Sequence, residues 1–138
     1  MKPVFAWPAR IYWEDTDAGG VVYYANYLKF LERARTEWLR SLGLEQRELL
    51  ERHGLVFAVV HVEAAYRRPA RYGDLLQVTC AVSTATRTSV TFAQEVRRDR
   101  LDGDLLLEGT VRVASLDAAS FRPRPLPEFM TRFFVAGE

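Results

Sequence analysis

One segment of the chain, residues 23–42, carries the longest helical pattern of apolar residues and constrains the fold more than any other. Its apolar positions recur every three or four residues, as they do along one face of a helix: Tyr27, Leu31, Ala34, Trp38 and Leu42. Phe30, Leu28 and Leu39 widen this stripe, and Gly43 follows as a residue typical of helix ends. A stripe of this width predicts a helix that other elements bury over much of its surface.

The segments around this helix have the two-residue period of β-strands, which indicates that a sheet covers it. Strands are predicted over residues 5–15, 55–66, 75–85, 89–98 and 105–116, and short helices over residues 45–52 and 128–134. Asp102 and Gly103 form a dipeptide that is typical of hairpin turns. The sequence therefore predicts an α+β fold in which a mostly antiparallel sheet curls around the long helix.

The composition sets limits on size and partners. The length of 138 residues fits one domain, spanning residues 1–138, and fits two domains poorly. Lys and Arg number 19 against 18 Asp and Glu, and this balance argues against a nucleic-acid binder, which needs a strong basic excess. All but two of the cations are arginines, which suit bidentate binding of carboxylates and phosphates. The arginines are therefore candidate phosphate contacts; the alternative is that their excess reflects genomic base composition or a hot habitat.

Cysteine and histidine are too few for the common disulfide and metal sites. Cys80 is the single cysteine, which excludes an intrachain disulfide and a CxxC pair. His53 and His61 lack the spacing of a zinc-binding motif, so neither a metal nor a cofactor is predicted. No apolar run has the length of a signal-peptide core or of the roughly 20 residues that span a bilayer. The expected location is the cytoplasm.

The segment from Glu14 to Gly20 holds the densest group of residues suited to catalysis. The carboxylates of Glu14, Asp15 and Asp17 precede Gly19 and Gly20, and the long helix follows. Glycines let a ligand approach the backbone closely, and a helix N-terminus presents free N–H groups and a positive dipole end. A carboxylate here is placed to act as nucleophile or base while the N–H groups stabilise an oxyanion. The alternative is that Asp15 or Asp17 only caps a turn.

The residues around this segment resemble a known family. Residues 10–27, RIYWEDTDAGGVVYYANY, are similar to the signature of the 4-hydroxybenzoyl-CoA thioesterase family of hotdog-fold proteins. Residues 30–40 resemble the Tol-Pal-associated acyl-CoA thioesterase branch of that family, and residues 67–74 and 87–89 also fit. The resemblance implies a five-stranded antiparallel sheet wrapped around the long helix. It also implies a dimer whose sheets join, commonly paired into a homotetramer, with sites at the subunit interface.

The resemblance also implies the reaction and its catalytic residues. The reaction is hydrolysis of a fatty or aromatic acyl-CoA to free acid and CoA. The second Asp of the D-x-D pair is catalytic in the family, which is Asp17 here, and it either attacks the carbonyl or activates a water. Backbone N–H groups near the helix start, at Tyr24 and its neighbours, polarise the thioester carbonyl. The Tol-Pal branch commonly has a histidine where Tyr24 stands, so no histidine acts at that position in this chain.

Further residues are predicted to bind the substrate. The loop and the helix start contribute Gly19, Gly20, Val21 and Asn26. The phosphates of CoA need cationic partners, and the residues expected near them are Arg68, Arg71, Arg87 and Ser89. Capping of the helix is an equally open role for Asn26.

The sequence leaves two other functions open. One is a non-catalytic hotdog protein that binds acyl-CoA or an acyl carrier protein, and the presence of Asp17 argues against it. The other is a hotdog dehydratase or hydratase, which usually needs a histidine and a carboxylate near the helix start. His53 and His61 both lie far along the chain from that position.

Overall fold

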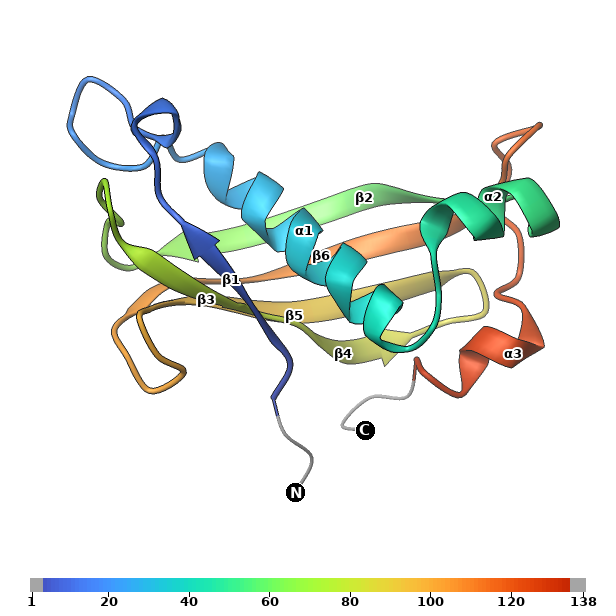
Figure 1. The fold of residues 1–138 in the computed structure, drawn as a ribbon. Coiled ribbons are helices and arrows are strands. Elements are labelled where there is room, and N and C mark those ends of the chain that lie inside the picture. Colours follow the sequence, from blue (N-terminus) through green and yellow to red (C-terminus); the bar gives the residue numbers. More distant parts are fainter. Residues whose placement is uncertain (1–3, 135–138) are drawn as a thin grey trace.

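The computed structural model describes residues 4–134, which fold as an antiparallel sheet curled around one long helix (Figure 1). The strands in chain order are β1 (Ala6–Arg10), β2 (Leu55–Tyr66), β3 (Leu75–Thr79), β4 (Ala81–Ala85), β5 (Ser89–Arg98) and β6 (Leu105–Asp117). The helices are α1 (Asn26–Ser41), α2 (Gln46–His53) and α3 (Glu128–Thr131), with one 3₁₀ turn, η1 (Trp13–Asp15). The predicted α+β class is confirmed.

The strand order across the sheet is β1-β3-β5-β6-β2, and every neighbouring pair is antiparallel. β4 also pairs with β5, beyond the part of β5 that β3 occupies. The strand predicted over residues 75–85 is therefore interrupted at Cys80, whose N–H donates to the Phe5 carbonyl (3.2 Å). At the break the Thr79 hydroxyl accepts the hydrogen bond of the Glu95 N–H (2.8 Å). The interruption turns the five expected strands into six strand segments.

The first strand is shorter than predicted, because it ends at Arg10 and not at residue 15. The Asp15 carboxylate accepts a hydrogen bond from the Tyr12 N–H (2.8 Å), which closes the chain into the turn η1. This local bond replaces the ladder bonds that a longer strand would make. The helix likewise starts at Asn26 and not at residue 23, because the residues before it belong to a loop.

The buried face of α1 follows most of the predicted apolar stripe, but Leu28, predicted to widen it, is 40% exposed. The buried residues of the helix are Tyr27, Phe30, Leu31, Ala34, Arg35 and Leu39, and they pack against inward-facing side chains of the strands. Leu31 and Ala34 are completely buried. Cys80 lies in the same core, and burial raises the pKa of its thiol to about 12. A thiol with so high a pKa is almost wholly protonated at neutral pH and is a poor nucleophile.

A polar contact inside this core ties the helix to the sheet. Gln94, on β5, donates from Nε2 to the carbonyl of Leu31 on α1 and to that of Thr79 on β3, both at 3.1 Å. Its Oε1 accepts a hydrogen bond from Nη1 of Arg35 (3.0 Å). Arg35 is only 8% exposed, and this burial lowers the pKa of its guanidinium. Gln94 therefore compensates part of the cost of burying this cation.

Replacing Gln94 by Leu should destabilise the protein more than the loss of one hydrogen bond implies. The Arg35 guanidinium would stay buried without its acceptor, so the free energy of unfolding should fall by roughly 3 kcal/mol. The double variant Arg35→Leu/Gln94→Leu should lose less than the two single variants together, because it leaves no buried charge unpaired. Urea denaturation of the four proteins measures this coupling. Strict additivity of the two single losses would contradict it.

Candidate active site

The segment between η1 and α1 forms a tight loop that presents Asp17. Thr16 and Val22 face each other in an isolated antiparallel bridge. Inside it, the Asp17 N–H donates to the Val21 carbonyl (2.9 Å), and the Gly20 N–H donates to the Asp17 carbonyl (3.0 Å). Gly20 has a φ of +78°, a left-handed conformation that glycine adopts without strain. These bonds give Asp17 a fixed place at the start of the turn.

The Asp17 side chain is exposed, and one of its oxygens is held by the turn. Oδ1 accepts a hydrogen bond from the Gly19 N–H (2.8 Å). The residue therefore does stabilise its own turn, as the structural alternative expects. Its charge also reaches Tyr23, whose pKa is raised chiefly by the neighbouring Tyr24 and further by Asp17. The second oxygen of the carboxylate has no hydrogen-bond partner among residues 4–134.

The start of α1 offers backbone donors on the same loop. Among residues 4–134, no oxygen accepts a hydrogen bond from the N–H of Tyr24 or of Ala25, which precede the first helical residue. Such N–H groups carry the partial positive charge of the helix N-terminus. The segment that carries the exposed Asp17 carboxylate therefore also carries donors that can hold an oxyanion.

Two side-chain hydrogen bonds fix the loop against the rest of the chain. Asn26 donates from Nδ2 to the carbonyl of Asp15 (2.9 Å), so its amide orients the loop. The hydroxyl of Tyr66, on β2, donates to the carbonyl of Tyr24 (2.8 Å). Because a peptide unit is planar and trans, a fixed Tyr24 carbonyl also fixes the direction of the next N–H. Burial raises the pKa of Tyr66, which keeps its hydroxyl protonated as a donor.

Tyrosines form one wall of this region. The ring of Tyr66 lies edge-on to those of Tyr24 (centroids 6.3 Å apart) and Tyr27 (5.5 Å), and the Tyr23 and Tyr24 rings are 4.9 Å apart. Tyr27 is buried, and its hydroxyl accepts a hydrogen bond from the Ala70 N–H (3.0 Å). Tyr24 is largely exposed. The wall therefore joins the helix start, β2 and the connection after β2.

Two of the predicted phosphate ligands lie at the same end of the sheet as the loop. Arg68 and Arg71 flank Ala70, whose carbonyl accepts a hydrogen bond from the Val22 N–H (2.9 Å). Arg68 lies 3.9 Å from the Asp104 carboxylate. The Arg71 guanidinium makes no ion pair within residues 4–134.

Arg87 and Ser89 lie elsewhere in the chain. They belong to the turn between β4 and β5 and to the start of β5, at the opposite end of the sheet from the Asp17 loop (Figure 1). The Ser89 hydroxyl pairs with that of Thr86 (2.8 Å), and Arg87 is exposed. A single chain therefore brings together only part of the predicted site.

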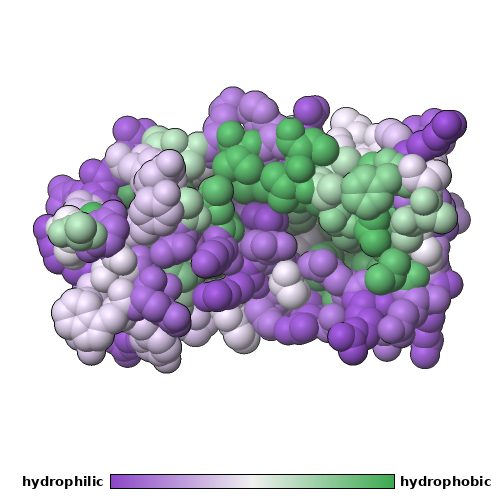
Figure 2. All heavy atoms as spheres, turned by 90° about the horizontal axis from the view of Figure 1, so that it is seen from above, coloured by the Kyte–Doolittle hydropathy of each residue, from purple (hydrophilic) through white to green (hydrophobic). Residues whose placement is uncertain are grey.

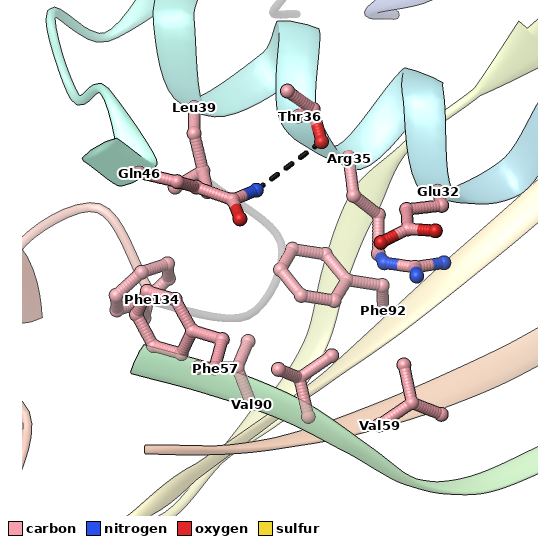
Figure 3. A pocket seen from close by; sticks show the side chains of 11 residues that line it. Glu32, Arg35, Thr36, Leu39, Gln46, Phe57, Val59, Val90, Phe92 and Phe134 are labelled. Carbon is pink, nitrogen blue, oxygen red and sulfur yellow. Dashed lines mark hydrogen bonds between the residues drawn. The ribbon is translucent and has the colours of Figure 1, made fainter. Parts of the chain in front are cut away.

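A small cavity opens between α1, α2 and the sheet (Figure 3). Its volume is about 50 Å³, and its walls are mainly the apolar side chains of Phe57, Val59, Val90, Phe92, Val113 and Phe134. Arg35 and Glu32 of α1 lie together at its polar edge. The cavity lies along the later turns of α1, away from the Asp17 loop at the start of that helix.

The described part of the chain contains no cluster of three or more His, Cys, Asp or Glu residues that could hold a metal ion. None of the helices within residues 4–134 is both long enough and apolar enough to cross a bilayer.

Comparison with known proteins places the chain in a family. Residues 11–134 match the Thioesterase-like superfamily. The chain belongs to this superfamily. The fold described above is therefore that of a thioesterase-like protein.

Individual relatives of this thioesterase-like chain agree with that placement. It is 44% identical to the acyl-CoA thioesterase YbgC of Haemophilus influenzae, over 90% of this chain and 89% of that one. It is 39% identical to the acyl-CoA thioester hydrolase YbgC of Escherichia coli, over 95% of this chain and 96% of that one. These relatives confirm the predicted family and the prediction that the protein is a thioester hydrolase.

A solved structure supports the fold. A 1,4-dihydroxy-2-naphthoyl-CoA thioesterase from Synechocystis superposes with a TM-score of 0.86, covering 96% of each chain at 23% identity. The predicted hotdog fold is confirmed by this match.

Sequence reasoning missed one residue that organises the site and one that ties the helix to the sheet. Tyr66 is the last residue of β2 and continues the alternating pattern of that strand, so the pattern does not distinguish it. Only the fold brings its hydroxyl to the Tyr24 carbonyl. Arg35 lies on the buried face of α1 between apolar neighbours. An arginine inside an apolar stripe was the available signal, because a buried cation needs a partner.

The two loop glycines should respond differently to alanine. Gly20→Ala should lower the free energy of unfolding by about 1 kcal/mol, because its φ of +78° is unfavourable for an L-residue with a Cβ. Gly19→Ala is the matched control, since Gly19 has no such φ. Its new Cβ would lie 3.2 Å from Asp17 Oδ1, so it should shift the carboxylate with a smaller loss of stability. Chemical denaturation compares them, and equal losses would contradict this description of the loop.

Proposed function

We propose that this protein is an acyl-CoA thioesterase, which hydrolyses an acyl-CoA to the free acid and CoA. The observation that carries the proposal is the exposed Asp17 carboxylate on a fixed loop that leads into the free N–H groups of Tyr24 and Ala25. The names of the YbgC relatives, identical at 39–44% of positions, support the same substrate class.

Asp17 is the residue that we assign to bond cleavage. In one route it attacks the thioester carbon, the CoA thiolate leaves, and water hydrolyses the resulting mixed anhydride. In the other it removes a proton from a water that attacks the same carbon, and the thiolate leaves from the tetrahedral adduct. In both routes the carbonyl oxygen becomes negative beside the N–H groups of Tyr24 and Ala25, which stabilise it.

Substrate positioning is assigned to the loop and to the arginines. Gly19, Gly20 and Val21 leave space at the backbone for the thioester, and Asn26 holds the loop in place. Arg68 and Arg71 lie at this end of the sheet and suit the phosphates of CoA by their charge and exposure. Arg87 and Ser89 are proposed for the same substrate, although they lie at the other end of the chain's own sheet.

A second copy of the chain would resolve this separation. β2 pairs only with β6 within residues 4–134, so its other edge is open. Val59, Val60 and Val62 on this strand are 48%, 52% and 38% exposed, and hydrophobic side chains gather on this face of the molecule (Figure 2). A long strand edge with exposed apolar side chains is normally covered. We therefore propose that β2 of one chain pairs antiparallel with β2 of another, which joins the two sheets in a homodimer.

The strand register indicates what such a dimer brings together. A two-fold axis near the middle of β2 would place Tyr66 of the partner subunit beside Leu55 of this chain, and Tyr66 is bonded to Tyr24. Ser89 pairs with Ala114, which pairs with Ala58, so Ser89 is level with the first part of β2. The partner's Asp17 loop would therefore approach the end that carries Arg87 and Ser89. The cavity that Phe57 and Val59 line lies at that end too and suits the far end of an acyl group.

The predictions of a homotetramer, a cytoplasmic location and an acyl carrier protein as partner stay predictions.

Replacing Asp17 by Asn tests the proposed reaction. The amide is nearly isosteric but is neither a base nor an effective nucleophile, so turnover should fall at least about a hundredfold. Release of free thiol from a panel of aliphatic and aromatic acyl-CoA esters measures it. Glu14→Gln is the matched control, because Glu14 is an exposed carboxylate on the same segment, and it should keep near-normal turnover.

The fold of both variants should be intact, as judged by thermal unfolding. Near-normal hydrolysis by Asp17→Asn would contradict the assignment of Asp17. Failure of the unmodified protein to hydrolyse any ester of the panel, together with tight binding of acyl-CoA, would favour a non-catalytic binding protein.

A further inference from the structure

Two exposed aromatic rings lie stacked beside the Asp17 loop. The rings of Trp13 and Tyr72 have centroids 4.1 Å apart and an interplanar angle of 12°. Trp13 is 70% exposed and Tyr72 is 52% exposed. Two large aromatic side chains that remain this exposed gain little stability from stacking on each other alone. An exposed aromatic pair commonly marks a binding surface.

The backbone holds this pair firmly and connects it to the catalytic loop. The Ile11 N–H donates to the Asp74 carbonyl and the Gly73 N–H donates to the Ile11 carbonyl, both at 2.9 Å, which brings the two segments side by side. The Trp13 carbonyl accepts hydrogen bonds from the N–H (3.0 Å) and the hydroxyl (2.7 Å) of Thr16, the residue before Asp17. The stacked pair therefore has a fixed position relative to Asp17.

Cationic side chains flank the pair. Arg71 precedes Tyr72, and its guanidinium has no ion-pair partner in the part of the chain that the structure describes. Arg10 donates from Nη1 to the Gly73 carbonyl (2.8 Å) and is otherwise exposed. The nearby Asp74 carboxylate is occupied by Arg98, which pairs with it directly. Glu14, on the Trp13 turn, lines a neighbouring groove together with Arg10.

We propose that the outer face of the Trp13–Tyr72 pair binds the adenine ring of CoA, with Arg71 and Arg10 beside it to bind phosphate groups. A purine can extend a stack of two parallel rings, and base stacking on aromatic side chains is a strong contact. Arginine suits phosphate oxygens by its geometry. The ligand that joins a flat ring, several phosphates and a thioester is an acyl-CoA, so this inference rests on the proposed function.

The test compares two substrates with the same acyl group, one an acyl-CoA and the other an acyl-pantetheine, which lacks the nucleotide. Trp13→Ala should raise KM for the acyl-CoA at least about fivefold, the effect of losing one stacked base, and leave kcat almost unchanged. The kinetic constants for the acyl-pantetheine should not change. Trp13→Phe should retain most of the affinity, and Trp7→Ala is the control, because Trp7 is a partly exposed tryptophan on β1, outside the pair.

Binding of CoA itself, measured by calorimetry, should weaken by the same factor in Trp13→Ala, and this readout does not depend on turnover. An unchanged CoA affinity would overturn the proposal. An equal loss with both substrates would also overturn it, because the role of Trp13 would then be structural. A smaller mass of Trp13→Ala by light scattering, with CoA affinity unchanged, would assign the pair to a subunit contact instead. Absence of hydrolysis of both substrates by the unmodified protein would contradict the proposed function and leave the CoA titration to decide the adenine site.

Discussion

The sheet buries one face of α1 and leaves the opposite face of the helix and the outer edge of β2 uncovered. Leu31 and Ala34 are fully enclosed, while Glu32 and Arg33 on the same helix are exposed. A single curved sheet of this size covers a helix from one side only, because its strands must stay hydrogen-bonded to one another. The open edge of β2, the cavity beside the later turns of α1 and the proposed joining of two sheets all follow from this incomplete cover.

The position of α1 also sets the geometry of the candidate site, because that site is built on the start of the helix. Gln94 fixes the middle of α1 to the sheet by bonding the Leu31 carbonyl. Tyr66 and Asn26 fix its start and the adjoining loop. The free N–H groups of Tyr24 and Ala25 thus have defined directions before any substrate arrives, and preorganised donors are the most effective kind for stabilising an oxyanion.

Much of this fold could be predicted from the sequence, since periodicity reports burial directly. The apolar stripe locates α1, and β5 has the predicted bounds, because each of these elements has one continuous pattern. The break at Cys80 and the turn at residues 13–15 could not be predicted from periodicity. Each depends on a side chain, Thr79 or Asp15, that takes over a backbone hydrogen bond, and alternation continues across both.

The candidate site likewise contains residues that the sequence predicts and residues that it does not. Asp17, Gly19 and Gly20 stand in a segment whose composition marks a loop, so the sequence is informative there. The role of Tyr66 depends on a contact between residues 42 positions apart, which no local pattern contains. In the proposed dimer, Arg87 and Ser89 would meet the Asp17 loop of a second chain, and a contact between copies leaves still less trace in one sequence.

Whether each active site takes residues from two chains can be measured directly in mixed dimers. Asp17→Asn and Arg87→Ala chains, unfolded and refolded together in equal amounts, should form hybrids with one intact site, giving about a quarter of the unmodified activity at low substrate concentration. The control mixture pairs Asp17→Asn with Arg68→Ala. Arg68 lies at the same end of the sheet as the Asp17 loop, so this mixture should show no such recovery. Activity of the first mixture no higher than the average of its two parents, with hybrids present, would contradict a site shared between two chains.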